Sequence, residues 1–202
     1  MTRSMVMLAT ATLISGAALA TPARAEIRTL FDSGLWSAYG GTDEGQRAVC
    51  GIATVGADGR RIAIQQLSGE ADLELVLEKP SWAIPENTSI EVVVQVDGQS
   101  WRPDRSVGST NQVRARVSFG VSIGFMRAVR TGQVVRVFFP SGTEPPWTGG
   151  LRGSSAAMNA LNDCRAAFPP AAPTQPFPPG QPQPNTPPTQ PFSPTTPPPP
   201  RG

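Results

Sequence analysis

The chain has 202 residues, with 17 basic and 15 acidic residues, two cysteines and no histidine. Without histidine, Ser-His-Asp and Cys-His catalysis are excluded, and two widely separated cysteines do not provide the ligand spacing of a zinc site. We therefore expect a protein that is not an enzyme and that uses neither a metal nor another cofactor.

Residues 1–25 are predicted to be a secretory signal peptide. Arg3 supplies a positive charge, the uncharged run Met5–Ala20 follows, and Ala23–Ala25 matches the small-x-small cleavage rule. The run holds 16 residues, fewer than the roughly 20 that cross a membrane. We expect cleavage before Glu26, a periplasmic or secreted protein, and no transmembrane anchor after cleavage.

Charge is unevenly distributed along the mature chain, which has 15 basic and 15 acidic residues. Residues 26–97 hold 5 basic and 12 acidic residues, whereas residues 98–168 hold 9 basic and 3 acidic residues. A basic second half would attract a phosphate or an anionic lipid surface. The interpretation that we prefer is that acidic strands pair beside basic strands in one sheet. A net charge of zero does not favour nucleic-acid binding, and we expect no nucleic-acid partner.

Residues 26–168 are predicted to form one β-rich globular domain, because most of this segment alternates between polar and apolar residues. Asp58-Gly59 is a hairpin turn signal between the first two alternating runs. Strands are predicted at residues 49–55, 61–67, 72–79, 89–98, 112–119 and 133–139.

Two of these predicted strands have oppositely charged outer faces. The strand 72–79 places leucines on one face and three acidic residues on the other: Asp72, Glu74 and Glu78. The strand 112–119 places Arg114 and Arg116 outside and an apolar row inside: Val113, Ala115, Val117 and Phe119. The three carboxylates are a candidate catalytic group for glycan hydrolysis. An ordinary solvent-exposed strand face explains them without any catalytic role, and we prefer that interpretation.

A first short helix is predicted at residues 121–132, where the alternation breaks. Phe125, Met126 and Val129 supply its apolar groups, and Gly132 is placed as the C-cap.

A second short helix is predicted to close the domain. Ser154 or Ser155 is expected to be its N-cap, followed by an apolar face of Met158, Leu161 and Cys164. A serine nucleophile would need a base, and the chain offers no histidine for that role. About six or seven strands and two short helices predict a mainly β fold, an antiparallel β-sandwich or barrel with a helix packed on it.

The two cysteines, Cys50 and Cys164, are predicted to form a disulfide bond. The exported compartment is oxidising, and an isolated cysteine pair there is most often a structural bridge. The alternative, a reactive thiol, needs an activating neighbour that the sequence does not show.

Four tryptophans lie in turn-rich segments: Trp36, Trp82, Trp101 and Trp147. Aromatic side chains on loops can stack on sugars or anchor a protein partner, so these residues are a candidate binding surface. They also commonly close the ends of small β-folds, which is the interpretation that we prefer.

Residues 169–202 are predicted to be a disordered proline-rich tail, since 16 of these 34 residues are proline. A near-repeat, "PTQPFPP" and "PTQPFSP", contains the two large apolar residues of the tail, Phe177 and Phe192. The tail is either a solvated spacer or a carrier of two copies of a docking motif for an envelope component.

The order of features resembles the invasion-associated locus B family of exported bacterial proteins. The resemblance rests on "RRIAIQ", "KPSWAIPENTSIEVVVQVDG", "GFMRAVRTGQVVRVFF" and "WTGGLRGSSAAMNAL", and it covers about Trp36 to Arg165. The chain departs from the family by lacking an additional cysteine pair in the region 101–120. The resemblance implies a β-rich periplasmic or secreted protein linked to host association, with no catalytic residues to transfer.

Our leading hypothesis is an exported, non-enzymatic binding protein for an unidentified protein or envelope component. The first alternative is an envelope structural or spacer protein that acts through its tail. The second alternative is a carboxylate-based glycan hydrolase that uses Glu74 or Glu78.

Overall fold

The computed structural model describes residues 26–43 and 45–168. The predicted signal peptide and the predicted proline-rich tail, with Phe177 and Phe192, lie outside the described residues.

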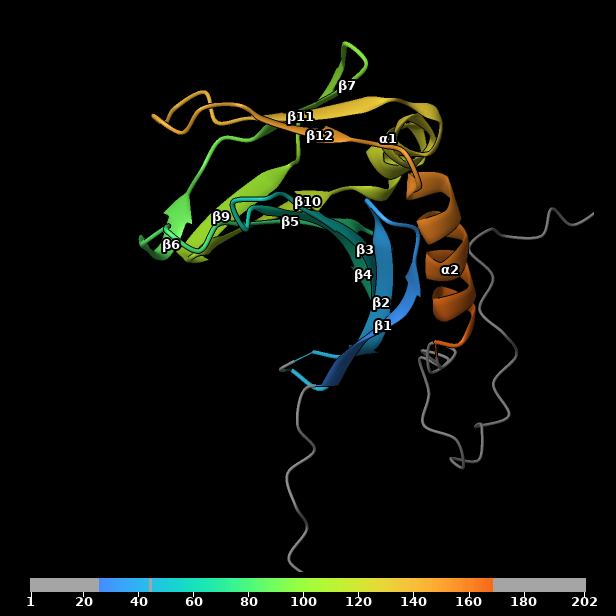
Figure 1. Cartoon of the computed structure of the whole chain (residues 1–202). Coiled ribbons are helices and arrows are strands. Elements are labelled where there is room, and N and C mark those ends of the chain that lie inside the picture. Colours follow the sequence, from blue (N-terminus) through green and yellow to red (C-terminus); the bar gives the residue numbers. More distant parts are fainter. Residues whose placement is uncertain (1–25, 44, 169–202) are drawn as a thin grey trace, which may run out of the picture. The chain divides into compact units, whose positions relative to one another are not determined.

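The larger of two antiparallel sheets has eight strands in the order β1-β2-β3-β4-β5-β10-β9-β6 (Figure 1). Its strands are β1 (Glu26–Asp32), β2 (Ser37–Thr42), β3 (Ala48–Val55), β4 (Arg61–Leu67), β5 (Leu73–Glu78), β6 (Ile84–Ser89), β9 (Arg105–Thr110) and β10 (Gln112–Val117).

The smaller sheet has four strands in the order β12-β11-β7-β8. Its strands are β7 (Val93–Val96), β8 (Gln99–Trp101), β11 (Val134–Phe138) and β12 (Trp147–Gly150). Figure 1 shows this sheet above β5, β9 and β10, while the large sheet bends so that β2 and β3 lie beside the helix α2 (Ser154–Ala166). The other helix, α1 (Phe119–Thr131), connects β10 of the large sheet to β11 of the small sheet. The predicted mainly β, sandwich-like fold with two short helices is confirmed.

The main core lies between the two sheets and the two helices. The inner faces of the sheet strands and of both helices contribute apolar side chains that are almost fully buried, among them Ile52, Ile64, Leu75, Leu77, Val94, Val113, Phe125, Val137, Met158 and Leu161. In β5 and β10, the alternating apolar residues of the sequence pattern are the ones that face this main core.

A smaller cluster covers the opposite face of the large sheet, around Tyr39. The Tyr39 ring lies over Gly51, where a Cβ atom would be 2.3 Å from the ring. Its hydroxyl donates a hydrogen bond of 2.6 Å to Gln65 Oε1, and the Arg61 guanidinium lies 5.0 Å above the ring. Burial raises the pKa of Tyr39, although the nearby Arg61 lowers it in part. The cluster packs the second face locally without a second helix layer.

The predicted pairing of acidic with basic strands is confirmed. β10 lies antiparallel to β5, with Arg116 opposite Glu74 and Arg114 opposite Val76. Arg114 donates to Glu74 Oε2 at 2.9 Å, and Arg116 Nε donates to Asp72 Oδ2 at 2.6 Å. On the other side of β5, Arg61 donates to Glu78 Oε1 at 2.8 Å.

The prediction that Phe119 is the last inward residue of a strand is wrong. Phe119 is the first residue of α1 and is 58% exposed. Two carboxylates outside the helix bind the first backbone N–H groups: Asp104 accepts from Ser118 at 3.0 Å and Asp72 from Phe119 at 2.8 Å. These contacts end the strand at Val117 and start the helix.

The strand predicted at residues 89–98 is confirmed only as the shorter β7, which is followed by the predicted Asp97-Gly98 turn, because the chain changes sheets near the start of the range. β6 ends at Ser89 on the edge of the large sheet, and β7 begins at Val93 in the small sheet. Ser89 and Ile90 lead into the β-branched run of β7 without a glycine or proline between them, so the sequence pattern does not show the break. Strands β1, β2, β6, β8, β9 and β12 were not predicted, since they are short, polar or rich in glycine.

The N-cap of α2 is Gly153, not a serine. Gly153 has a φ of 94°, and a Cβ there would be 2.6 Å from Ser33 Oγ, so glycine is required in both respects. Ser154 is fully buried, and its Oγ donates a hydrogen bond of 2.7 Å to the carbonyl oxygen of Val129 in α1. The serine therefore links the two helices instead of capping one of them.

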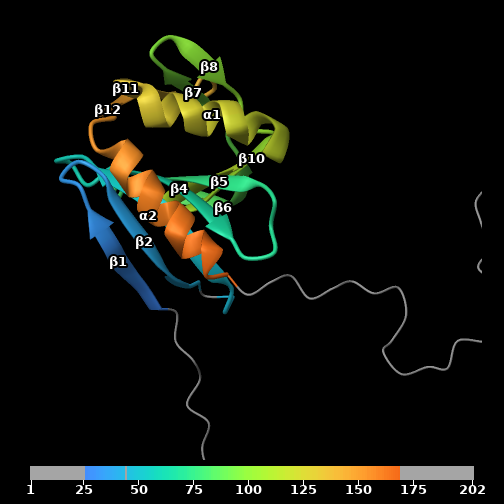
Figure 2. The same cartoon turned by 90° about the vertical axis from the view of Figure 1, so that its right-hand side faces the viewer.

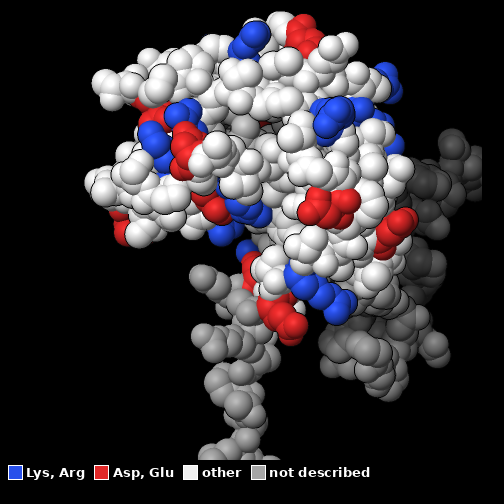
Figure 3. All heavy atoms as spheres, viewed as in Figure 1, with Lys and Arg blue, Asp and Glu red and all other residues white. Residues whose placement is uncertain are grey.

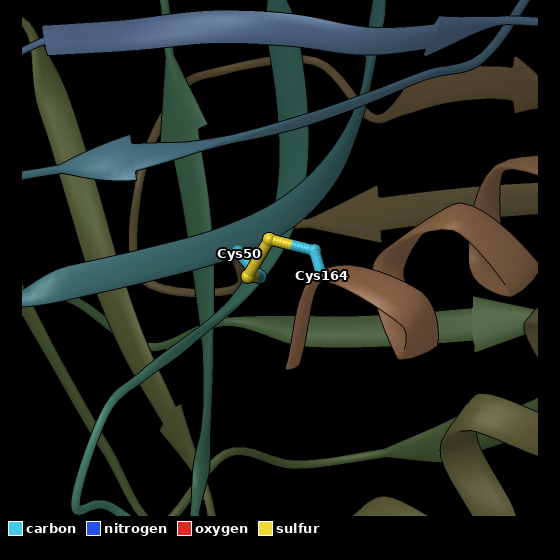
Figure 4. Close-up of a disulfide and its surroundings, with 2 residues drawn as sticks. All are labelled: Cys50 and Cys164. Atoms are coloured by element: carbon cyan, nitrogen blue, oxygen red, sulfur yellow. A yellow bond between two sulfur atoms is a disulfide. The ribbon is translucent and has the colours of Figure 1, made fainter. Parts of the chain in front are cut away.

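The predicted disulfide bond between Cys50 and Cys164 is confirmed (Figure 4). It joins β3 to α2 across 114 positions of sequence, with a Cα–Cα distance of 5.9 Å. A Cβ on Gly40 of β2 would lie 2.6 Å from Cys164 Sγ, so the bridge packs directly on the glycine of the neighbouring strand.

Candidate functional site

A cavity of about 360 Å³ lies between α1 and α2, above the connection from β4 to β5. Figure 2 shows the two helices diverging, with β4 and β5 visible between them. We call this space the interhelical cavity. It is lined by Gln66, Leu73, Phe119, Ile123, Met126, Arg127, Arg130, Met158 and Arg165, with Ala71, Ser122 and Asn162.

The apolar wall of the interhelical cavity is partly open to solvent. Leu73 and Met158 are buried and form its inner part. Phe119 and Ile123 lie four residues apart on α1 and are 58% and 56% exposed. These two side chains extend the apolar wall from the buried part of the cavity to the surface, where a ligand could cover them.

Three arginines add positive charge to the cavity: Arg127 and Arg130 from α1, and Arg165 from α2. Figure 3 shows basic side chains gathered over α1. None of the three forms an ion pair with any acidic residue of the described segments, although Arg130 Nη1 donates to Asn159 Oδ1 at 2.9 Å. No acidic side chain within these segments lines the cavity. The site therefore combines an apolar wall with three arginines that form no ion pair within the described segments.

Gln66 provides a third feature of the cavity, a buried acceptor. It follows the core-facing Ile62 and Ile64 in β4 and is only 7% exposed. Its Nε2 donates to the carbonyl oxygens of Glu70 at 2.7 Å and of Ala71 at 3.5 Å. Its Oε1 has no hydrogen-bond partner, which is uncommon for a buried side-chain oxygen.

Sequence reasoning did not identify this site. The excess of basic residues after Gly98 was one visible signal. In the structure, some of these arginines pair with strand carboxylates, such as Arg114 and Arg116. Three others line the cavity, and the rest, among them Arg136 and Arg152, lie elsewhere on the surface. A polar Gln66 at a core position of β4 was a second signal, and it was not used.

The four tryptophans do not converge on one surface. Trp36 and Trp101 are buried in separate parts of the core. Trp36 Nε1 donates a hydrogen bond of 2.8 Å to the carbonyl oxygen of Gly150, and the Trp101 ring packs against Phe125. Trp82 and Trp147 do meet, with ring centroids 5.1 Å apart in a stacked arrangement.

Trp82 and Trp147 share a carboxylate, that of Glu144. It accepts from Trp147 Nε1 at 2.8 Å and from Trp82 Nε1 at 3.2 Å, and Lys79 Nζ lies 2.8 Å away. Burial raises the pKa of Glu144, but the hydrogen bonds from Lys79 and the two indoles outweigh burial and hold this pKa below its usual value.

Trp82 is half-buried and lines a second cavity of about 400 Å³, together with Ile84, Ile90 and Phe139. The acidic residues of this second cavity are already paired: Glu144 with Lys79, and Glu91 with Arg102. Because it has no uncompensated charge or buried acceptor without a partner, it is a less specific candidate than the interhelical cavity.

The carboxylates of β5 and its flank are held in ion pairs. The Arg116 side chain, followed by the backbone N–H of Phe119, holds the pKa of Asp72 below its usual value. A general acid in glycoside hydrolysis needs the opposite shift, a raised pKa. Within residues 26–43 and 45–168, no three cysteine or acidic side chains are grouped as metal ligands would be.

Comparison with family models, with curated proteins and with solved structures finds no match to this chain. In the described part of the chain, neither helix is long and apolar enough to cross a membrane.

Proposed function

We propose that the mature protein is an exported, non-enzymatic binding protein and that it binds an anionic amphiphile in the interhelical cavity. The observation that carries this proposal is the juxtaposition of Phe119 and Ile123 with three arginines that have no acidic partner. The apolar chain of the ligand lies along Phe119 and Ile123, and its anionic group lies among Arg127, Arg130 and Arg165.

The energetic basis is burial of apolar surface together with charge-assisted hydrogen bonds. Each of these solvent-exposed or partly exposed arginines that gains an anionic partner contributes on the order of 0.2–1 kcal/mol. The exposed areas of Phe119 and Ile123 add a hydrophobic contribution of about 25 cal/mol for each Å² that is covered. Both contributions require a ligand with a charged and an apolar part.

Export and a role in host or envelope association complete the proposal. Export is supported by the pattern of residues 1–25 and by the disulfide bond, which forms and persists in oxidising compartments. The association role is supported by the resemblance to the invasion-associated locus B family.

The test is calorimetric titration of the mature, oxidised protein with myristate and with uncharged monomyristin, both below their aggregation concentrations. We expect myristate to bind and monomyristin to bind at least tenfold more weakly. The variant Arg127→Gln/Arg130→Gln should lose about tenfold in myristate affinity. Its matched control, Arg136→Gln/Arg152→Gln, removes two exposed arginines that do not line the cavity and should bind like the wild type. Equal weakening in both variants would show non-specific attraction and refute the site.

The alternative, a spacer that acts through residues 169–202, is separated by truncation after Phe168. If the truncated protein binds myristate like the full mature chain but no longer associates with the cell envelope, the tail carries the envelope association and the cavity carries the ligand. If truncation leaves both unchanged, the spacer hypothesis is refuted.

A further inference from the structure

The geometry points to a ligand that carries a hydrogen-bond donor, a hydroxyl or an amide N–H, next to its anionic group. This inference rests on the proposed function and specifies which anionic amphiphiles the interhelical cavity prefers. It is carried by Gln66, whose Oε1 is buried at the cavity wall without a partner.

The orientation of the Gln66 amide is determined by its surroundings. Its nitrogen faces two backbone carbonyl oxygens, those of Glu70 and Ala71, which accept hydrogen bonds and cannot donate them. The other amide atom must therefore be the oxygen. A buried amide oxygen without a donor costs free energy, so a group that supplies a donor to it gains affinity relative to one that does not.

The position of Gln66 Oε1 in the cavity indicates where the hydrogen-bond donor of the ligand must lie relative to its anionic group. Gln66 lies opposite Cys50 in the pairing of β4 with β3, and Cys50 is bonded to Cys164. Arg165 follows Cys164 directly and lines the same cavity. The partnerless acceptor thus lies at the Arg165 end of the cavity, so the donor of the ligand must lie close to its anionic group.

The chemical class that satisfies both conditions is a β-hydroxyacyl or N-acylated amphiphile. In a β-hydroxy fatty acid, the hydroxyl lies two carbons from the carboxylate carbon and begins the apolar chain. An N-acylated amino acid places an amide N–H at the same junction. Because Oε1 is buried, the donor reaches it only after a change of rotamer among the side chains that line the cavity, of which Met126, Arg130 and Arg165 are long and flexible.

The experiment compares myristate, each enantiomer of β-hydroxymyristate and N-lauroylglycine in calorimetric titrations of the mature, oxidised protein. We expect at least one donor-bearing ligand to bind about tenfold more tightly than myristate. Which of them gains affinity distinguishes a hydroxyl from an amide donor. If β-hydroxymyristate gains, one enantiomer should be preferred, because the acceptor occupies a fixed position.

The variant Gln66→Met removes the acceptor with little change of volume and should bind myristate and the donor-bearing ligands with equal affinity. Gln112→Met, in β10 and outside the cavity lining, is the matched control and should keep the preference. If Gln66→Met does not fold, the comparison of ligands on the wild-type protein still tests whether the cavity prefers a ligand with a hydrogen-bond donor.

The possible failures are distinguishable. If myristate binds and neither donor-bearing class binds more tightly, this inference is overturned and the proposed function stands. If none of the ligands binds, the proposed function fails and this inference fails with it. A preference that persists in Gln66→Met would also overturn the assignment to Gln66.

Discussion

The hydroxyl of Ser154 donates a hydrogen bond of 2.7 Å to the carbonyl oxygen of Val129, which joins the first residue of α2 to the last turn of α1. The Ser154 side of this contact is inaccessible to solvent, because Ser154 is fully buried. It fixes the two helices to each other at one end, and the interhelical cavity lies where they diverge from that point.

Replacing Ser154 by alanine is expected to destabilise the protein by about 1–3 kcal/mol, because the buried Val129 carbonyl would lose its donor. Ser155→Ala is the control, since Ser155 is exposed and should change the free energy of unfolding by less than about 0.5 kcal/mol. Urea unfolding of the two variants measures the difference. Equal stability of both variants would contradict a structural role for the Ser154 hydroxyl.

Reduction of the Cys50–Cys164 bond is expected to lower the free energy of unfolding by roughly 4–5 kcal/mol in the chain-entropy model, because the bond closes a very long loop. Urea unfolding with and without reductant measures the loss. Mass spectrometry should show a gain of two hydrogens on reduction. Two free thiols in the native exported protein would refute the bridge.

Gly51→Ala is expected to destabilise the protein by about 1–3 kcal/mol, since the new methyl group would displace the Tyr39 ring from its place over the strand. Gly124→Ala is the opposite case within α1. The nearest atom to its added Cβ is Trp101 Nε1 at 4.0 Å, so alanine fits and favours the helix. We expect a gain of roughly 0.5–1 kcal/mol there. Thermal unfolding should shift in opposite directions for the two variants.

Glu144→Gln is expected to reduce both the stability at neutral pH and its dependence on acid. The pKa of Glu144 is lower in the folded protein than its usual value of 4.5, so its carboxylate stabilises the fold above that value. This contribution is lost as the pH falls through the lower folded pKa. Unfolding free energies measured from pH 6 to pH 3, a span of about three units around the usual carboxyl range, should fall less steeply for the variant. An unchanged slope would show that Lys79 and the two indoles do not stabilise the carboxylate.

Strands and helices with a clear local sequence pattern were predicted accurately, whereas features set by distant residues were not. β3, β4, β5, β10 and β11 were predicted within one or two residues, because each strand contributes apolar residues at every second position to the main core. The helix that ends before Gly132 was predicted because the alternation breaks there and a glycine follows, and Gly132 is the C-cap of α1 in the structure. Phe119 was placed wrongly because the carboxylate of Asp72 that starts the helix lies 47 positions earlier in the chain.

For the candidate site as well, local sequence patterns predicted some features, and contacts between distant residues determined the others. Sequence alone established a mainly β domain with two helices, the absence of histidine chemistry, a disulfide pair and an excess of basic residues after Gly98, since composition and alternation are local properties. Only the tertiary structure decided which arginines remain without a carboxylate and which glutamine oxygen is left without a donor. The pairing of the arginines depends on the register of β5 against β10, and the isolation of the Gln66 oxygen depends on its burial beside the cavity between α1 and α2. Contacts between residues distant in the chain set the register and the cavity.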